Sequence, residues 1–449
     1  MTTSALLEKG VLDAGLEDRE AKEELAKLFE KNFMDLAAEA DDIRRRLHPN
    51  DIVTYIVDRN INYTNVCWVA CSFCAFYRTK RQAEKGVLDT GLEDREAKRD
   101  LAGLFDRNFL ELASEADEIR RRLHPNNIVT YIVDRNINYT NVCWVACSFC
   151  AFYRTKRQAQ NGDGYVLTIE QVLQKIQETV DLGGTGILMQ GGLHPDIGME
   201  YVTELFRTIR KEYPQIQVHA LSPAEIWHLV DKSGLSLEDT LRELKKAGLM
   251  SIPGGGAEIL TDETRGRIAP AKNSTATWLE VMEAWHSLGM KSTATMMFGI
   301  DESYEERIEH LLQIRKLQAK TGGFTAFIDW TFQPDNTTYL KKHPDFEKVS
   351  SLDYLKTTAI SRIILDNVAN IQASWVTQPM KTASIALHAG CNDMGSIMIE
   401  ENVVKEAGAS YCTSEEELRS VIERSGFRPA KRTTLYDRVL EPGISVEDI

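Results

Sequence analysis

Three cysteines lie close together in the stretch Asn141-Val-Cys-Trp-Val-Ala-Cys-Ser-Phe-Cys150, separated by three and then by two residues. A structural zinc site normally takes four protein ligands, so three thiolates alone do not complete one. Cysteine thiolates also hold iron–sulfur clusters. In a [4Fe–4S] cluster with three such ligands, the fourth iron stays open to a substrate or cofactor. We therefore predict that Cys143, Cys147 and Cys150 bind a [4Fe–4S] cluster.

Composition and charge are those of an ordinary globular enzyme. The chain has 449 residues, of which 43% are hydrophobic and 27% charged. Its net charge of −14 argues against nucleic acid as a main partner, because nucleic-acid-binding domains are usually basic. The sequence shows no apolar run of about 18 residues and no signal-peptide pattern, so we expect a cytoplasmic protein with no membrane partner. Cysteines stay reduced in that compartment, where clustered cysteines indicate metal or catalytic sites.

Strands and helices alternate along the chain after the start of the cysteine region. The stretch Ile128-Val-Thr-Tyr-Ile-Val133 is rich in β-branched and aromatic residues and predicts a strand, after which the cysteine loop begins. A helix is predicted to begin with a capping box at Thr168. Further strands are predicted at residues 186–190, 216–221, 249–253, 292–298, 324–332 and 371–376, with helices between them and a last helix at 413–425. This alternation indicates an α/β fold, a partial or full (β/α) barrel of parallel strands. In such barrels, the chemistry collects on the loops after the strands.

The three-cysteine pattern occurs twice. Residues 9–83 align without gaps with residues 85–159 and differ at 11 of 75 positions, so that Cys67, Cys71 and Cys74 repeat the spacing. If the N-terminal copy held the working position, residues 84–159 would loop out. Closing the longer loop costs about 0.6 kcal/mol for each doubling of its length. The displaced copy would also expose an apolar helix face and a strand edge, which is the larger penalty.

We therefore predict three regions. Residues 1–84 are an extra copy of the helix–strand–cysteine unit, appended to the enzyme or partly disordered. Residues 85–378 form the barrel with the working cysteine loop, and residues 379–449 form a C-terminal extension that packs on it. The sequence leaves open whether the N-terminal cysteines bind a cluster or whether the duplication is an artefact of the gene model.

Several loops after predicted strands carry residues that suit a cofactor site. Gly191 and Gly192 follow a strand, where bare backbone lets a cofactor approach and leaves N–H groups free. A second glycine run is either a backbone cradle for a cofactor or a plain turn, and it consists of Gly254, Gly255 and Gly256. Three polar residues at strand ends are predicted to face the barrel mouth, each as a general base or as a hydrogen-bonding support for other groups: His219, Glu258 and Asp329.

Several of these stretches are similar to a known family. The cysteine spacing after the first strand, with Phe149 before the last cysteine, resembles the radical S-adenosylmethionine superfamily. Longer stretches resemble the cyclic dehypoxanthine futalosine synthase family within it, and these are residues 127–143, 184–192, 219–223, 251–258, 293–299 and 373–378. The resemblance covers about residues 109–437. The family has one cysteine loop, so the N-terminal copy departs from its pattern.

The resemblance implies an enzyme, an oxidoreductase and cyclase of the futalosine route of menaquinone biosynthesis. The reduced cluster would cleave S-adenosylmethionine bound at its open iron and give a 5′-deoxyadenosyl radical. That radical would remove a ribose hydrogen from dehypoxanthine futalosine, and the carbon radical would close onto the aromatic ring. Loss of an electron and a proton would then give the cyclic product. The last step needs a general base, for which His219, Glu258 and Asp329 are the candidates.

The resemblance also implies cofactor contacts and partners. Phe149 would contact the adenine, and Gly191 and Gly192 would hold the amino or carboxylate group of S-adenosylmethionine. An electron donor such as flavodoxin or ferredoxin would reduce the cluster. Three alternatives remain: a related radical enzyme such as aminofutalosine synthase or FO synthase, an enzyme that uses both triplets, and a non-catalytic iron–sulfur protein. A protein of the last kind usually has a fourth cysteine ligand, and neither triplet has one nearby. The sequence gives neither the reductant nor the oligomeric state.

Overall fold

A computed structural model of the chain describes residues 43–46, 95–409 and 413–449. The chain divides into two compact units, Met1–Tyr77 and Arg78–Ile449. In the first unit the described residues, 43–46, are helical. The N-terminal triplet Cys67, Cys71 and Cys74 and the predicted boundary after residue 84 lie outside the described residues. The fold that positions the candidate site belongs to the second unit.

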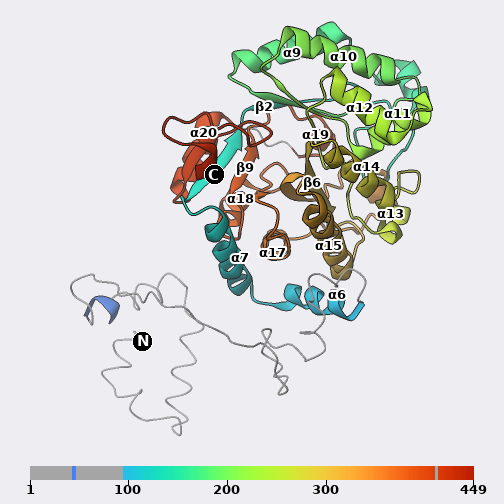
Figure 1. Cartoon of the computed structure of the whole chain (residues 1–449). Coiled ribbons are helices and arrows are strands. Elements are labelled where there is room, and N and C mark those ends of the chain that lie inside the picture. Colours follow the sequence, from blue (N-terminus) through green and yellow to red (C-terminus); the bar gives the residue numbers. More distant parts are fainter. Residues whose placement is uncertain (1–42, 47–94, 410–412) are drawn as a thin grey trace. The chain divides into compact units, whose positions relative to one another are not determined.

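A parallel sheet forms the centre of the second unit (Figure 1). In the described part of the chain this sheet has ten strands in the order β10-β1-β9-β8-β7-β6-β5-β4-β3-β2, and every pairing is parallel. Its strands are β1 (Ile128–Ile132), β2 (Asp134–Ile137), β3 (Gly186–Met189), β4 (Gln217–Ala220), β5 (Ser251–Ile252), β6 (Lys291–Phe298), β7 (Phe324–Thr331), β8 (Asn370–Gln372), β9 (Asp393–Ser396) and β10 (Arg428–Lys431).

The sheet curls into a barrel because one extended segment joins its two ends. β1 lies between β9 and β10, whereas β2 pairs with β3 at the opposite end of the strand order, and only Val133 separates β1 from β2. The Val133 carbonyl accepts a hydrogen bond from the Thr185 amide (3.0 Å), just before β3. The preceding carbonyl, of Ile132, accepts one from the Ile397 amide (3.1 Å), just after β9. The predicted α/β barrel of parallel strands is confirmed.

Helices surround the sheet, as Figure 1 shows. Those that precede or follow the first strands are α6 (Arg95–Ala102), α7 (Phe109–Leu123), α8 (Lys156–Gln158), α9 (Ile169–Asp181), α10 (Met199–Glu212), α11 (Pro223–Ser233) and α12 (Leu237–Ala247). The later ones are α13 (Asp262–Ile268), α14 (Thr275–Ser287), α15 (Tyr304–Thr321), α16 (Thr338–Lys342), α17 (Ser351–Ile364), α18 (Met380–Ala386), α19 (Val403–Glu406) and α20 (Glu415–Arg424). Within the described ranges, none of the helices combines the length and the apolar character that crossing a membrane requires.

Local sequence explains where these elements begin. α9 starts with a capping box, in which the Thr168 hydroxyl accepts the Gln171 amide and the Gln171 side chain accepts the Thr168 amide, as predicted. α11 starts in the same way at Ser222 and Glu225. The strand β1 is buried along its whole length, as is usual for a strand of a parallel sheet that helices cover from outside. The helix before it, α7, packs against α17, so the second copy of the repeat is part of the barrel.

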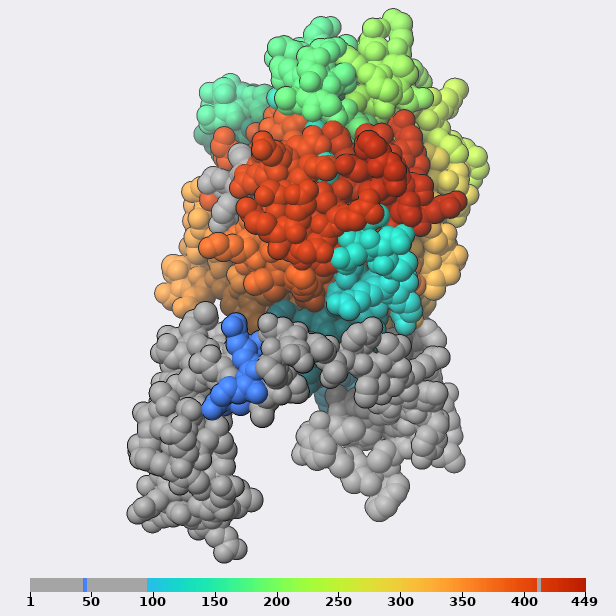
Figure 2. All heavy atoms as spheres, turned by 90° about the vertical axis from the view of Figure 1, so that its left-hand side faces the viewer, coloured from blue at the N-terminus to red at the C-terminus, as the bar shows by residue number. Residues whose placement is uncertain are grey.

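The C-terminal region contributes to the sheet itself. We predicted an extension that packs on the barrel, but β9 and β10 lie on either side of β1. The segment after β10 contacts the start of β4, where the Gln217 side chain donates to Asp437 at 2.9 Å and accepts the Leu435 amide at 3.0 Å. Figure 2 shows the C-terminal segments, in red, covering one face of the molecule beside segments coloured cyan and green.

Candidate active site

The cysteine loop follows β2 directly, and backbone hydrogen bonds fix its shape. The Cys143 amide donates to the Arg154 carbonyl (2.9 Å), and the Arg154 amide donates to the Asn141 carbonyl (2.7 Å), which ties the two sides of the loop together. Between them, the Ser148 hydroxyl donates to the Ile268 carbonyl at 2.7 Å. The loop is thereby held at the carboxyl ends of the barrel strands.

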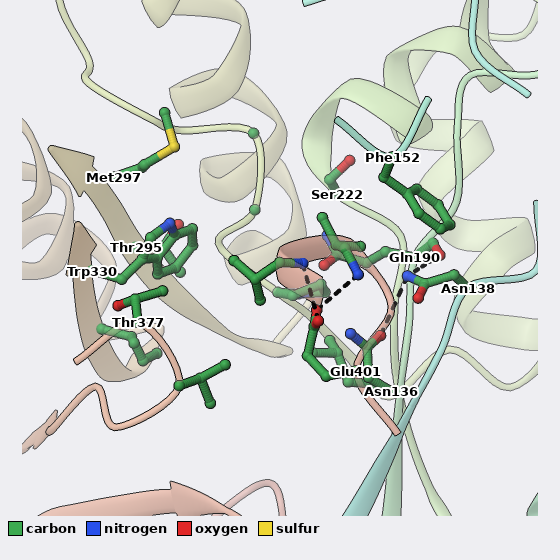
Figure 3. Close-up of a pocket in the computed structure, with 18 of the residues that line it drawn as sticks. Asn136, Asn138, Phe152, Gln190, Ser222, Thr295, Met297, Trp330, Thr377 and Glu401 are labelled. Carbon is green, nitrogen blue, oxygen red and sulfur yellow. Dashed lines mark hydrogen bonds between the residues drawn. The ribbon is translucent and has the colours of Figure 1, made fainter. Parts of the chain in front are cut away.

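All three thiols of this loop line one cavity of ≈ 460 Å³ inside the barrel. The predicted site residues on its wall are Cys143, Cys147, Phe149, Cys150, Gly191, Gly192, His219, Gly255, Gly256 and Glu258. Figure 3 shows two facing sides of the cavity, with Asn136, Asn138, Phe152 and Gln190 on one and Thr295, Met297 and Trp330 on the other. The structure therefore brings most of the predicted residues to one place.

The three thiols lie on one loop at the cavity wall. Among the residues that the structure describes, no group of three His, Cys, Asp or Glu side chains is arranged to hold one ion. A cluster binds each thiolate through a different iron, so its ligands are spread more widely. Burial raises the pKa of Cys147 to about 12 and raises the pKa of Cys150 as well, so metal binding must displace their protons. Cys391 is also buried, but it does not line the cavity.

Gly191 and Gly192 lie beside the cysteine loop, but their amides are not free. The Gly191 amide donates to Glu225 Oε1 (2.8 Å) and the Gly192 amide donates to the Thr140 carbonyl (2.9 Å). The prediction that these N–H groups stay free for a cofactor is therefore wrong. The glycine at 192 is needed for close packing, because an added Cβ would lie 2.3 Å from the Val142 carbonyl oxygen. The loop after β3 can thus lie directly against the cysteine loop.

The second glycine run, after β5, divides into two parts. Gly254 is absent from the cavity wall, and a Cβ there would lie 2.6 Å from the Thr295 amide nitrogen of β6. Gly255 and Gly256 do line the cavity. Gly256 has a φ of +83°, a conformation that favours glycine, and lies beside Lys272, whose Nζ would be 3.6 Å from an added Cβ. The candidate cradle is therefore reduced to Gly255 and Gly256.

Glu258 is part of a buried ion pair on the cavity wall. Its Oε1 lies 2.9 Å from Lys272 Nζ, and its Oε2 lies 3.8 Å from Arg265 Nη1. Oε2 is buried and accepts no hydrogen bond. The backbone of Glu258 has a φ of +42°, which is uncommon outside glycine, so its surroundings hold it in this conformation. Lys272 Nζ also lies 5.5 Å from the centre of the Phe149 ring, which connects Glu258 to the cysteine loop.

His219 lies in β4 with its ring buried. Its Nδ1 contacts the Ser251 hydroxyl, and its Nε2 lies 3.5 Å from the Thr293 hydroxyl. Burial, together with the positive charge of Arg432, lowers the pKa of His219 to about 3. The imidazole is therefore neutral near pH 7 and is a weak base.

Asp329 does not reach the cavity. Along β7, Ile328 and Trp330 line the cavity, whereas the side chain of Asp329 lies on the opposite face of the strand. There it accepts hydrogen bonds from the hydroxyls of Thr358 (3.1 Å) and Ser361 (3.3 Å) on α17. Burial raises its pKa to about 7. The predicted position of Asp329 at the barrel mouth is wrong, because in a strand neighbouring side chains point to opposite faces.

Sequence reasoning missed Glu225 and Lys272. Glu225 is buried, and its two oxygens accept hydrogen bonds from the Tyr139 hydroxyl (2.8 Å), the Gly191 amide (2.8 Å) and the Ser222 amide and hydroxyl (2.7 Å each). A capping box directly after a strand could have indicated Glu225. Lys272 lies in a loop, and nothing in its spacing points to the cysteines.

Comparisons with known proteins agree with this architecture. The sequence pattern described as the Radical SAM superfamily matches residues 137–314, and the pattern of the CofH/MqnC C-terminal region matches residues 321–443. The fold is shared with methylornithine synthase, at a TM-score of 0.57 and 19% identity over 77% of this chain and 97% of that one. It is shared too with the FeFe-hydrogenase maturase HydG from Carboxydothermus hydrogenoformans, at a TM-score of 0.58 and 17% identity over 79% and 82% of the two chains. The barrel, its three-cysteine loop and these matches define an enzyme of the radical S-adenosylmethionine superfamily.

Within that superfamily, the chain belongs to the cyclic dehypoxanthine futalosine synthase family. The protein of that name from Halalkalibacterium halodurans is 46% identical over 354 residues, which are 78% of this chain and 94% of the relative. The one from Streptomyces coelicolor is 45% identical over 331 residues, 73% and 82% of the two chains. A differently named relative, 5-amino-6-(D-ribitylamino)uracil–L-tyrosine 4-hydroxyphenyl transferase 1 from Methanosarcina barkeri, is 40% identical over 366 residues, 79% and 94% of the two chains.

Proposed function

We propose that this enzyme converts dehypoxanthine futalosine to cyclic dehypoxanthine futalosine in the futalosine pathway of menaquinone biosynthesis. The observation that carries the proposal is a three-cysteine loop on the wall of a barrel cavity, in a chain 46% identical to a protein named for this product. The similarity extends over 94% and 82% of the two relatives of that name, so it is not confined to the part that carries the cysteines.

We propose that Cys143, Cys147 and Cys150 hold a [4Fe–4S] cluster and that S-adenosylmethionine binds at the iron without a cysteine. When bound, these cofactors would supply the 5′-deoxyadenosyl radical that removes a hydrogen from the substrate ribose. The chain's own contribution is to fix the loop and shape the cavity. Gly192 supports this role because it lets the loop after β3 press against Val142 and Cys143.

The same cavity would hold the adenosyl group and the substrate. Phe149 lies between two of the cysteines in sequence and lines the wall, which suits a contact with the adenine. Gly191, Gly255 and Gly256 offer wall positions without side chains. Apolar aromatic residues complete much of the wall, among them Trp330, Phe332 and Trp375. A wall of this kind excludes water and protects a reactive radical from side reactions.

We propose that Glu258, rather than His219, is the general base that takes the proton in the last step. Glu258 has a buried oxygen on the cavity wall that accepts no hydrogen bond, so it can take a proton from a bound intermediate. His219 is less suited because both of its ring nitrogens already lie against hydroxyl groups, those of Ser251 and Thr293. Asp329 is excluded as the base because its side chain lies on the face of β7 that packs against α17, away from the cavity.

We propose that the second cysteine copy is the working one. The Radical SAM pattern begins at residue 137, so it contains Cys143 and excludes Cys67. The strands β1 and β2 that lead into the second copy's loop are part of the sheet. We also propose that residues 1–84 are an extra copy of the helix–strand–cysteine unit and that the catalytic barrel comprises β1 to β10 with their helices.

The name of the Methanosarcina barkeri relative supports a second candidate function, the transfer of a 4-hydroxyphenyl group from tyrosine to a ribitylaminouracil. Its 40% identity is lower than that of the two cyclic dehypoxanthine futalosine synthases, so we place it second. For either reaction we propose a small electron-transfer protein, such as flavodoxin or ferredoxin, as the reductant. A cytoplasmic location is supported by the need to keep the cysteine loop reduced.

One assay separates the two functions. The protein is reconstituted anaerobically with iron and sulfide and reduced with dithionite. It is then given S-adenosylmethionine with dehypoxanthine futalosine in one reaction, and with tyrosine and 5-amino-6-(D-ribitylamino)uracil in another. We expect cyclic dehypoxanthine futalosine in the first reaction and no coupled product in the second. Coupled product without cyclic product would make the transferase the correct function.

A further inference from the structure

Lys272 is a buried cation beside the cysteine loop. It lies between α13 and α14, its side chain is 13% exposed, and it lines the same cavity as the three thiols. Burial of a charged lysine is costly unless the charge is paired. Here the pairing comes from Glu258 Oε1, which lies 2.9 Å from Lys272 Nζ. The fold therefore keeps a positive charge at this position.

The ammonium of Lys272 also acts on the cysteine loop. Its Nζ lies 5.5 Å from the centre of the Phe149 ring, and Phe149 is the residue between Ser148 and Cys150. Lys272 lines the same cavity wall as Cys143, Cys147 and Cys150, and its side chain is largely buried there. The ammonium therefore lies beside the cysteine loop, in surroundings where burial strengthens electrostatic effects.

The charges of Lys272 and its immediate ion-pair partners do not cancel. Glu258 is the carboxylate that pairs with Lys272, but the same carboxylate also lies 3.8 Å from Arg265, whose side chain is 6% exposed. Arg265 is fixed in place by donating to the carbonyls of Gly256 (3.2 Å) and Ala257. Two cations therefore share one carboxylate, and this group carries a net positive charge.

We propose that Lys272 is a positioning residue that raises the reduction potential of the cluster held by Cys143, Cys147 and Cys150. This inference rests on the proposed cluster. Reduction adds one negative charge to the cluster, and a nearby buried cation stabilises the reduced form more than the oxidised form. Net charge and solvent exposure around a cluster are known to set its potential. Lys272 would make the enzyme easier for its electron donor to reduce.

The test is the midpoint potential of the reconstituted cluster, measured by potentiometric titration with electron paramagnetic resonance and without S-adenosylmethionine. Lys272→Met keeps the length of the side chain and removes its charge. We expect its reduction equilibrium to shift about tenfold toward the oxidised form, which for one electron is about 59 mV. Lys272→Arg should keep most of the wild-type potential. Lys246→Met, which changes a lysine that is 74% exposed on α12, should leave the potential unchanged.

A second variant makes the test independent of whether Lys272→Met folds. Glu258→Gln removes the carboxylate and leaves Lys272 and Arg265 uncompensated, so the potential should rise. A lower potential in Lys272→Met and a higher potential in Glu258→Gln would show that charge sets the potential, because a general disruption of the site would shift both in the same direction. A fall or no change in Glu258→Gln, or an unchanged potential in Lys272→Met at full iron content, would overturn the inference. If wild-type protein takes up no cluster, the proposed function itself fails, which iron analysis detects separately.

Discussion

The backbone amide of Gly191 donates a 2.8 Å hydrogen bond to Oε1 of Glu225, a buried carboxylate at the start of α11. The same oxygen accepts the hydroxyl of Tyr139 from the beginning of the cysteine loop, also at 2.8 Å. One carboxylate therefore connects the glycine loop after β3, the cysteine loop and the capping box of α11. Glu225 holds together the two loops that form one wall of the cavity.

Replacing Glu225 tests this connection. Glu225→Ala leaves the Gly191 amide and the Tyr139 hydroxyl buried without their partner, at about 1–3 kcal/mol for each group. We expect the protein to lose about 3 kcal/mol of unfolding free energy and to bind S-adenosylmethionine at least tenfold more weakly. Denaturant unfolding and equilibrium binding measure these effects. Gln171→Ala, in the more exposed capping box of α9, is the control and should cost about 1 kcal/mol without changing binding.

Gly192 sets the approach of the glycine loop to the cysteine loop. In Gly192→Ala the new methyl group would lie 2.3 Å from the Val142 carbonyl oxygen, so one of the two loops must move. We expect the iron content after reconstitution to fall to less than half of the wild-type value. Gly103→Ala is the matched control, because no atom lies within 4 Å of an added Cβ there. Full iron content in Gly192→Ala would show that the contact does not matter for the cluster.

The raised pKa of Asp329 predicts that the stability of the protein depends on pH. Its pKa is about 7 in the folded protein against a usual 3.8, so folding takes up a proton between these values. The unfolding free energy contributed by Asp329 is thus fully present below about pH 4 and is lost as the pH rises through about 7. The loss is up to about 4 kcal/mol, at 1.36 kcal/mol per unit. We expect Asp329→Asn to be more stable than wild type at pH 8 and to lose this advantage near pH 4.

Denaturant unfolding from pH 4 to pH 8 measures this difference. Asp345→Asn, at an exposed position, is the control and should follow the wild-type curve throughout. Parallel curves for wild type and Asp329→Asn would contradict the assigned surroundings of Asp329.

The amounts of cyclic product and of 5′-deoxyadenosine formed by variants decide whether Glu258 or His219 is the general base. A missing general base typically costs about 10²–10⁴-fold in rate. We expect Glu258→Gln to form cyclic product at least 100-fold more slowly while it still cleaves S-adenosylmethionine to 5′-deoxyadenosine. His219→Gln should keep both products within about tenfold of wild type. Chromatography with mass detection gives the ratio of the two products, and the reverse pattern would assign the base to His219.

The sequence predicts the barrel well because its strong signals are local. The β-branched stretch Ile128–Val133 and the capping box at Thr168 each determine their own element. β9 and β10 were missed because Asp393-Met-Gly-Ser and Arg428-Pro-Ala-Lys lack the β-branched and aromatic residues of a typical strand. Their pairing with neighbouring strands makes them strands: both pair with β1, and β9 also pairs with β8.

The candidate site is predicted in its residues more than in its contacts. The cysteine spacing identifies the loop, and four of the five predicted glycines, Gly191, Gly192, Gly255 and Gly256, do line the cavity. The Gly191 amide donates its hydrogen bond to Glu225, which lies 34 residues further along the chain and comes close only in the folded protein. Asp329 shows the limit for strands: both faces of β7 are largely buried, so polarity alone does not tell which face carries the cavity. Lys272 is a loop lysine in sequence and a buried cation in the fold.

The central claim is that the cysteine loop of the second copy, set in this barrel, supports cyclisation of dehypoxanthine futalosine. The most direct measurement is the yield of cyclic dehypoxanthine futalosine and of 5′-deoxyadenosine from two triple variants, reconstituted anaerobically beside the wild type. We predict that a variant with Cys67, Cys71 and Cys74 changed to alanine forms both products. The variant with Cys143, Cys147 and Cys150 changed to alanine should form neither. The account would be contradicted if the variant of Cys143, Cys147 and Cys150 formed these products, or if only the variant of Cys67, Cys71 and Cys74 lost them.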